Sequence, residues 1–301
     1  NRNGMKTLSL PSALAAAGLA FSAVFPAFAQ QPPAMAEAGP PAPPYADMAD
    51  LVIASPLVID ATIRSTSKIK PAEATGLAPG ATRFYVEADV NALIRGPGAI
   101  PPRIGYLLDA APDPLGRTPK YKKSRVLLFA RPVAGQGGQI QLVTPGAQLG
   151  WSPASDALAR RITGEVLAAD APPVVVGVGN AFHVPGSLPG EGETQIFLRT
   201  ADRRPVSLSI LRRPGEQPRW AVALSEIIDD AAAPPKPDTL LWYRLACSLP
   251  RALPDDSVAS LSESDSAQAR EDYRFVLERL GPCGRTGATA GRPVSGDGGP
   301  E

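Results

Sequence analysis

Apolar and β-branched residues alternate in part with polar ones along residues 82–143, and turn residues interrupt the pattern. Between the turns there is no helix-length period. The strand-like runs are 83–94, 103–108, 124–130 and 139–143. An earlier run, 51–63, predicts a first long strand in which Pro56 marks a bulge or an edge, because proline cannot donate to a ladder. These five runs predict an antiparallel sheet.

Helical periods follow the central block. Ser152 and Pro153 are typical of an N-cap and a first helical position, and Leu158, Ile162 and Val166 form one apolar stripe. Farther on, Asp238 is placed to cap a short helix that ends at Pro250.

The segment Ser262-Glu263-Ser264-Asp265 fits a capping box, and it opens a helix that Gly281-Pro282 stops.

A second sheet is expected between these helices. Residues 174–178 form a short strand pattern, and 177–192 is a glycine-rich stretch expected to be a loop. Three strand-like runs with tight turns follow and predict a meander. They are 194–200, 205–211 and 219–224.

The chain is expected to be exported. After Met5 and Lys6, residues 8–25 are mostly apolar, and Ala27-Phe28-Ala29 is typical of a signal cleavage site before Gln30. A single transmembrane anchor is the alternative, but the apolar core is short for a span of about 20 residues. No stable transmembrane span is predicted after cleavage. The expected localisation is periplasmic or secreted.

Cleavage would change the net charge from +1 to −1 by removing Arg2 and Lys6. A near-neutral chain has no overall field that attracts nucleic acid, so no nucleic-acid partner is predicted. The two cysteines, Cys247 and Cys283, favour one disulfide in an exported chain. A metal or redox pair is the rival interpretation, but one histidine cannot complete a zinc site, and no metal or cofactor is predicted.

Part of the chain resembles a known family. Ala49-Asp50-Leu51-Val52-Ile53, the run from Phe84 to Ile94-Arg95-Gly96, and Arg125-Val126-Leu127-Leu128-Phe129 before a hairpin strand occur in this order. Over residues 46–150 the chain resembles the netrin-like, tissue-inhibitor-of-metalloproteinase-like OB barrels of exported bacterial proteins. The resemblance implies a five-stranded OB-like barrel. The inhibitors' zinc-chelating N-terminal cysteine is not implied, because no cysteine precedes Cys247.

Candidate catalytic residues are few. His183 is the only histidine, and Ser187 lies near it in the glycine-rich stretch. A nucleophilic serine needs a base, a carboxylate that orients the base, and oxyanion donors. The sequence around Ser187 is not a nucleophile elbow, so a serine-type hydrolase remains the alternative function.

One dense basic run stands out as a candidate binding surface. It contains Lys120, Lys122, Lys123 and Arg125, and OB barrels bind ligands with basic grooves and aromatic side chains such as those of Phe84, Tyr85 and Tyr106. A solvated loop whose lysines discourage edge pairing is the competing interpretation. The expected partner is an envelope protein or an anionic envelope component.

The sequence therefore predicts an α+β protein with an OB-like barrel, a connecting helix, a small antiparallel sheet and a disulfide-linked helical hairpin. Its leading function is a non-enzymatic binding or protein-interaction module of the envelope, with a hydrolase or a structural envelope component as alternatives. The predicted segments are a signal peptide (1–29, with an upstream remnant at 1–4), a linker (30–45), the OB-like domain (46–150), the helix (151–170), the small sheet (171–230), the hairpin (231–283) and a disordered tail (284–301).

Overall fold

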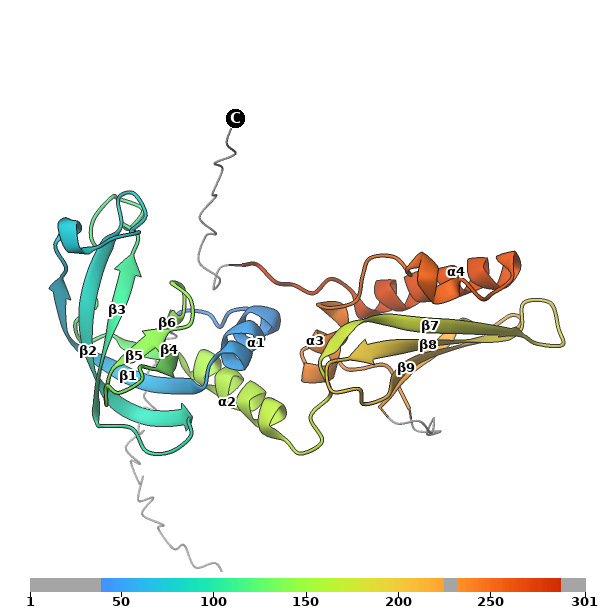
Figure 1. Ribbon diagram of the computed structural model, residues 1–301, viewed down its shortest axis with the longest axis horizontal. Coiled ribbons are helices and arrows are strands. Elements are labelled where there is room, and N and C mark those ends of the chain that lie inside the picture. Colours follow the sequence, from blue (N-terminus) through green and yellow to red (C-terminus); the bar gives the residue numbers. More distant parts are fainter. Residues whose placement is uncertain (1–38, 225–231, 288–301) are drawn as a thin grey trace, which may run out of the picture. The chain divides into compact units, whose positions relative to one another are not determined.

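The computed structural model describes residues 39–224 and 232–287 (Figure 1). The predicted signal peptide with its cleavage site, most of the linker and the tail after residue 287 lie outside these ranges. Within them, no helix is both long and apolar enough to cross a membrane. The protein is mixed α+β, with two antiparallel sheets, as the sequence predicts.

The first sheet has six strands. Their order is β3-β2-β1-β4-β5, and β6 also pairs with β4. The strands are β1 (Leu57–Lys68), β2 (Thr82–Arg95), β3 (Arg103–Ala110), β4 (Arg125–Pro132), β5 (Ile140–Leu142) and β6 (Gln148–Gly150); a short 3₁₀ turn, η1 (Pro71–Glu73), follows β1. All five predicted strand regions form strands, and the sequence pattern missed β6.

The first predicted strand begins too early, because Leu51 to Ala54 belong to helix α1 (Tyr45–Ala54). A short continuous apolar run fits a buried helix as well as a buried strand. The boundary lies at Ser55, whose hydroxyl donates to the carbonyl of Leu51 (2.6 Å) and which is held extended before Pro56. Pro56 therefore separates a helix from a strand.

The central strands of this sheet are buried on both faces. Along β1, Leu57, Ile59 and Ala61 face the core enclosed by the sheet, whereas Val58 joins a second core with α1 and with helix α2 (Pro153–Leu167). The same division holds along β4, which explains why its residues read as a continuous apolar run.

The structure does not show a closed barrel. Between β3 and β5, a single parallel bridge joins Gly105 to Gln139, and the N–H of Gly105 donates to the carbonyl of Gly138 (2.8 Å). In the described residues these strands form no longer ladder, so the sheet stays open along the rest of β3.

The second sheet has four strands in the order β10-β9-β8-β7, all antiparallel. They are β7 (Val175–Pro185), β8 (Gly192–Thr200), β9 (Val206–Arg212) and β10 (Arg219–Ala223). Helix α4 (Glu263–Leu280) lies along one face of it (Figure 1).

The prediction of a glycine-rich loop over 177–192 is wrong. Strand β7 runs on to Pro185, and only residues 186–191 form the turn. The pairing of β7 with β8 is irregular at two places, between Val175 and Gly177 and between Val178 and Ala181. Glycines that suggest a loop thus lie at bulges, where the backbone departs from regular pairing.

The helix caps follow the sequence with one exception. The hydroxyl of Ser152 accepts from the N–H of Ser155 (3.1 Å) at α2, and that of Ser262 accepts from the N–H of Asp265 (3.1 Å) at α4. Helix α3 (Leu240–Ala246) is capped by Thr239 and not by Asp238. A second 3₁₀ turn, η2 (Asp255–Val258), lies between α3 and α4.

The predicted disulfide between Cys247 and Cys283 is confirmed, with the two Cα atoms 4.9 Å apart. It joins the end of α3 to the residue that follows α4 and so links the two helices into the predicted hairpin.

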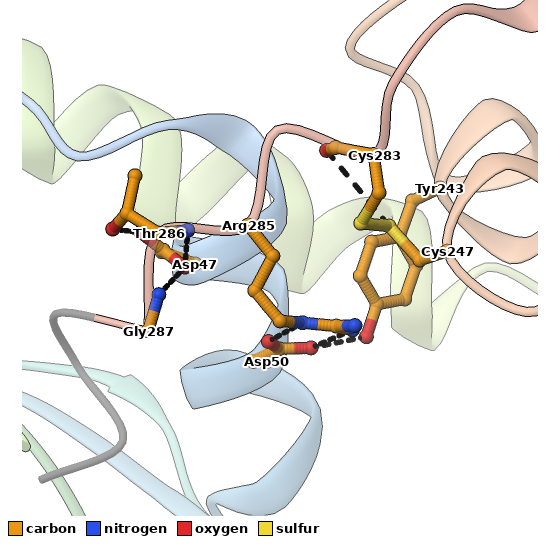
Figure 2. A network of polar contacts seen from close by, with 8 residues as sticks. All are labelled: Asp47, Asp50, Tyr243, Cys247, Cys283, Arg285, Thr286 and Gly287. Carbon is orange, nitrogen blue, oxygen red and sulfur yellow. Dashed lines mark hydrogen bonds and ion pairs between the residues drawn. A yellow bond between two sulfur atoms is a disulfide. The ribbon is translucent and has the colours of Figure 1, made fainter. Parts of the chain in front are cut away.

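The residues after Cys283 bind α1 as a strap, which we define as residues 284–287 (Figure 2). Arg285 donates to both carboxylate oxygens of Asp50 (2.5 and 2.9 Å), and Tyr243 also donates to Asp50 (2.5 Å). The fully buried Asp47 accepts from the N–H and hydroxyl of Thr286 and from the N–H of Gly287. The predicted disordered tail therefore begins with four ordered residues.

We expect loss of the disulfide to destabilise the protein. Replacing both cysteines by serine should lower the free energy of unfolding by roughly 3–4 kcal/mol, because the unfolded chain gains the entropy of an open loop. Urea unfolding of the wild type with and without reductant measures this, and the double variant serves as the control that reductant should not change. Two free thiols in oxidised native protein would contradict the assignment.

A second prediction concerns Asp60, which is buried on β1. Burial alone raises its pKa, but hydrogen bonds from Arg125 (2.6 and 3.0 Å) and Asn91 (3.0 Å) outweigh burial and hold the pKa below its usual value. The stabilisation is then complete above the unfolded-state pKa of about 3.9 and is lost as the pH falls through the lower folded-state pKa.

We therefore expect the wild type to lose stability more steeply below about pH 4 than Asp60→Asn, which should already be less stable at neutral pH. Urea unfolding across pH 2–6 tests this. Parallel curves for the two proteins would show that Asp60 carries no such coupling.

Candidate functional site

A groove of about 570 Å³ lies over the open part of the first sheet. Its lining comes from β2, β3, the end of β4, the β4–β5 connection, β5 and the three residues that follow β5. The residues used below are Tyr85, Leu107, Arg131, Gln136, Gln139 and Gln141. Both apolar and hydrogen-bonding side chains line it, and its volume falls in the range typical of small-ligand sites.

Gly105 permits the close approach that shapes this groove. A Cβ atom there would lie 2.2 Å from the Tyr85 hydroxyl and 2.9 Å from the Gln139 amide nitrogen. With glycine in place, the Gln139 amide donates to the Tyr85 hydroxyl (3.0 Å) across the junction of β3 and β5. Strand β3 and the residue before β5 thus meet at one point, and the sheet is open beside this point.

The β4–β5 connection forms a wall of the groove. It turns at Gly135 and Gly138, which both have positive φ, and backbone bonds from Gln136 to Val133 (3.2 Å) and from Gln139 to Gln136 (3.1 Å) tighten it. The same connection lines a smaller hollow of about 430 Å³ on the side of residues 97–101.

The groove carries one unpaired charge. Arg83 and Asp109 neutralise each other through two parallel hydrogen bonds (2.6 and 2.7 Å). Arg131 is exposed, and no ion pair is found for it within residues 39–224 and 232–287. The arrangement leaves a guanidinium on the rim with its donors free for a ligand.

The structure separates the residues of the predicted basic surface. Lys120, Lys122 and Lys123 are exposed in the loop before β4. Arg125 is bound to Asp60 and stacks on the ring of Trp151, 3.7 Å from its centroid.

Tyr106 belongs to the core, with 1% of its surface exposed, and also borders the groove; its hydroxyl donates to Gln148 (2.6 Å). Burial raises its pKa. Of the predicted surface, only the three lysines are therefore exposed and take no part in the interactions described above.

The candidate catalytic residues have separate partners. His183 lies on β7, and its Nδ1 is 2.9 Å from the hydroxyl of Thr194, which donates to the buried carboxylate of Asp272. Because that hydroxyl gives its one proton to Asp272, His183 is the donor at Nδ1. Arg212 binds the other oxygen of Asp272 (2.5 Å).

Ser187 lies in the turn after β7, where its N–H donates to the carboxylate of Glu191 (3.1 Å). The N–H of Leu188 donates to the same oxygen (3.2 Å), so Glu191 closes the turn. No contact between the imidazole of His183 and the hydroxyl of Ser187 is found in the described structure.

A second surface is exposed and apolar. Val176, Phe182 and Val184 of β7 and Phe197 of β8 are exposed, and the two phenylalanine rings pack edge to face with centroids 5.9 Å apart. The strand pairing places Gln195 opposite Phe182 and Glu193 opposite Val184, so polar side chains share this face.

In the described ranges no group of three or more His, Cys, Asp and Glu side chains is placed to hold a metal ion. No protein-family model matches the chain, and no curated protein matches it with significant similarity. The resemblance to netrin-like domains stays a prediction.

Sequence reasoning found Tyr85 and Tyr106, which both line the groove, but missed Leu107, Arg131 and the glutamines. The density of basic residues drew attention to Lys120–Arg125, whereas a single arginine on a strand has no comparable local signal. The available sequence hint was that Leu107, next to Leu108, breaks the alternation of apolar and polar residues in this run.

We expect a fluorophosphonate probe to leave Ser187 unlabelled. In the described contacts, His183 hydrogen-bonds to Thr194 and not to Ser187, so the Ser187 hydroxyl lacks an activating base. Mass spectrometry of the treated native protein measures labelling, with heat-denatured protein as the control for nonspecific reaction. Labelling that Ser187→Ala and His183→Ala both abolish would instead support a hydrolase.

Proposed function

We propose that the protein is an exported, non-enzymatic binding module and that the groove beside β3 and β5 is its ligand site. The observation that carries the proposal is the combination of groups in this groove. An unpaired guanidinium, several carboxamides and an exposed leucine line one hollow on the first sheet. Such convergence of polar groups in a formed hollow is typical of a binding site.

The strand order supports an OB-like fold for this domain. A five-stranded OB barrel is partly open, and its ligands bind on the face of strands 2 and 3 next to the connection between strands 4 and 5. Here the groove uses Arg83 and Tyr85 from β2, Leu107 from β3 and the β4–β5 connection. The parallel contact of Gly105 with Gln139 lies where such a barrel would close.

The disulfide supports the export part of the proposal, because disulfides persist in oxidising compartments. A module in the periplasm or outside the cell meets envelope polymers and envelope proteins. The unpaired Arg131 favours an anionic envelope component over a neutral one.

Site-specific photo-crosslinking tests the proposal. The full chain is expressed in the envelope of its host with a photoreactive amino acid at Leu107, at Leu115 or at Phe182. We expect a discrete adduct from position 107, because this side chain faces the groove. Leu115 is more exposed (74% against 52%) but lies outside the groove, so it serves as the matched control.

The adduct from position 107 should disappear when Gly105→Val forces Tyr85 and Gln139 apart. Adducts from position 182 alone would move the binding function to the apolar face of β7 and β8. Absence of adducts from both 107 and 182 would refute the binding module and favour a structural envelope component.

A further inference from the structure

We propose that the groove recognises a carboxylate-bearing saccharide, with Arg131 pairing with the carboxylate. This inference rests on the proposed function and specifies its ligand. It follows from the charges, the neutral hydrogen-bonding groups and the apolar surface that the groove presents together.

The charges select an anionic ligand. The one carboxylate in the lining, that of Asp109, is bound on both oxygens by Arg83. Arg131 adds a positive charge that no described side chain neutralises. A guanidinium offers a planar pair of donors that matches a carboxylate, so this charge favours a carboxylate placed at the rim.

The neutral groups select hydroxyl-rich chemistry. Gln136, Gln139 and Gln141 each carry a side-chain amide that both donates and accepts, and the Tyr85 hydroxyl does the same. Sugar hydroxyls also donate and accept, so each can be satisfied in either orientation. Leu107, about half exposed, supplies an apolar surface for the C–H face of a sugar ring.

The β5 side of the groove does not favour an extended peptide, so such a peptide would have to pair with the open edge of β3 beyond Gly105. Peptides that bind as an added strand need a free sheet edge of several residues. Strand β5 has three residues, and just after it the N–H of Val143 already donates to Phe129 within the sheet (3.0 Å). A short edge of this kind offers few backbone bonds.

An array of acidic and neutral oligosaccharides, probed with the full chain, tests the inference. Acidic members carry uronic or lactyl carboxylates, and neutral members have the same backbones without them. We expect retention of at least one acidic member, with at least tenfold weaker binding of its neutral counterpart and weaker binding at high salt.

Arg131→Gln should weaken this binding at least tenfold, and Arg131→Lys should restore part of it because charge returns without the planar fork. Lys122→Gln is the matched control, since it removes one positive charge from the exposed loop before β4. An equal loss in Lys122→Gln would assign the effect to general electrostatics and overturn the role of Arg131.

The outcomes separate this inference from the proposed function. Adducts at Leu107 without retention of any acidic saccharide leave the binding module standing and overturn the saccharide. Equal retention of acidic and neutral members overturns the carboxylate. Binding of a glutamate hexapeptide, at an affinity above that of every acidic saccharide, would replace the saccharide by an acidic peptide.

Discussion

Helix α1 can be buried only because its carboxylates find partners more than 200 residues away. Asp47 is fully enclosed, and an unpaired carboxylate in that position would cost several kcal/mol. Its donors are Thr286 and Gly287, while Arg285 neutralises Asp50. The disulfide fixes Cys283, the residue just before this strap. The strap therefore loses less conformational entropy when it binds α1. The packing of α1 on the first sheet therefore depends on a cross-link elsewhere in the chain.

The same sheet is firmly held in one part and open in another. Strands β1 and β4 are enclosed on both faces, with alternate residues in two different cores. Among the described residues, the backbone of β3 bonds to the segment leading into β5 only at Gly105, opposite Gly138 and Gln139. The groove thus lies beside strands that are enclosed on both faces, so the backbone that carries its side chains is held in place before a ligand arrives. Such preorganisation reduces the entropy that binding must overcome.

Local signals sufficed for much of the fold. The caps at Ser152 and Ser262, the meander of β8 to β10 and the cysteine pair could each be predicted from a few neighbouring residues. The errors arose where local signals are ambiguous: Leu51 to Ala54 is apolar without a period, and glycines mark bulges as well as loops. The groove could not be predicted because its lining is assembled from residues spread over positions 83 to 145. Arg131 differs from the other groove arginine because no acidic side chain in the described residues pairs with it. A sequence does not show which charged side chains pair.

The two outer strands of the second sheet limit how this protein can associate with its own copies. At β10, the N–H of Val222 donates to the carbonyl of Ala233, so a neighbouring segment occupies part of that edge. At β7, two irregularities break the straight row of backbone groups that a further strand would need. Neither edge is a good template for adding strands from another molecule. Open-ended addition of strands to a sheet leads to fibres. These two edges protect the protein from such growth without any charged residue on β7.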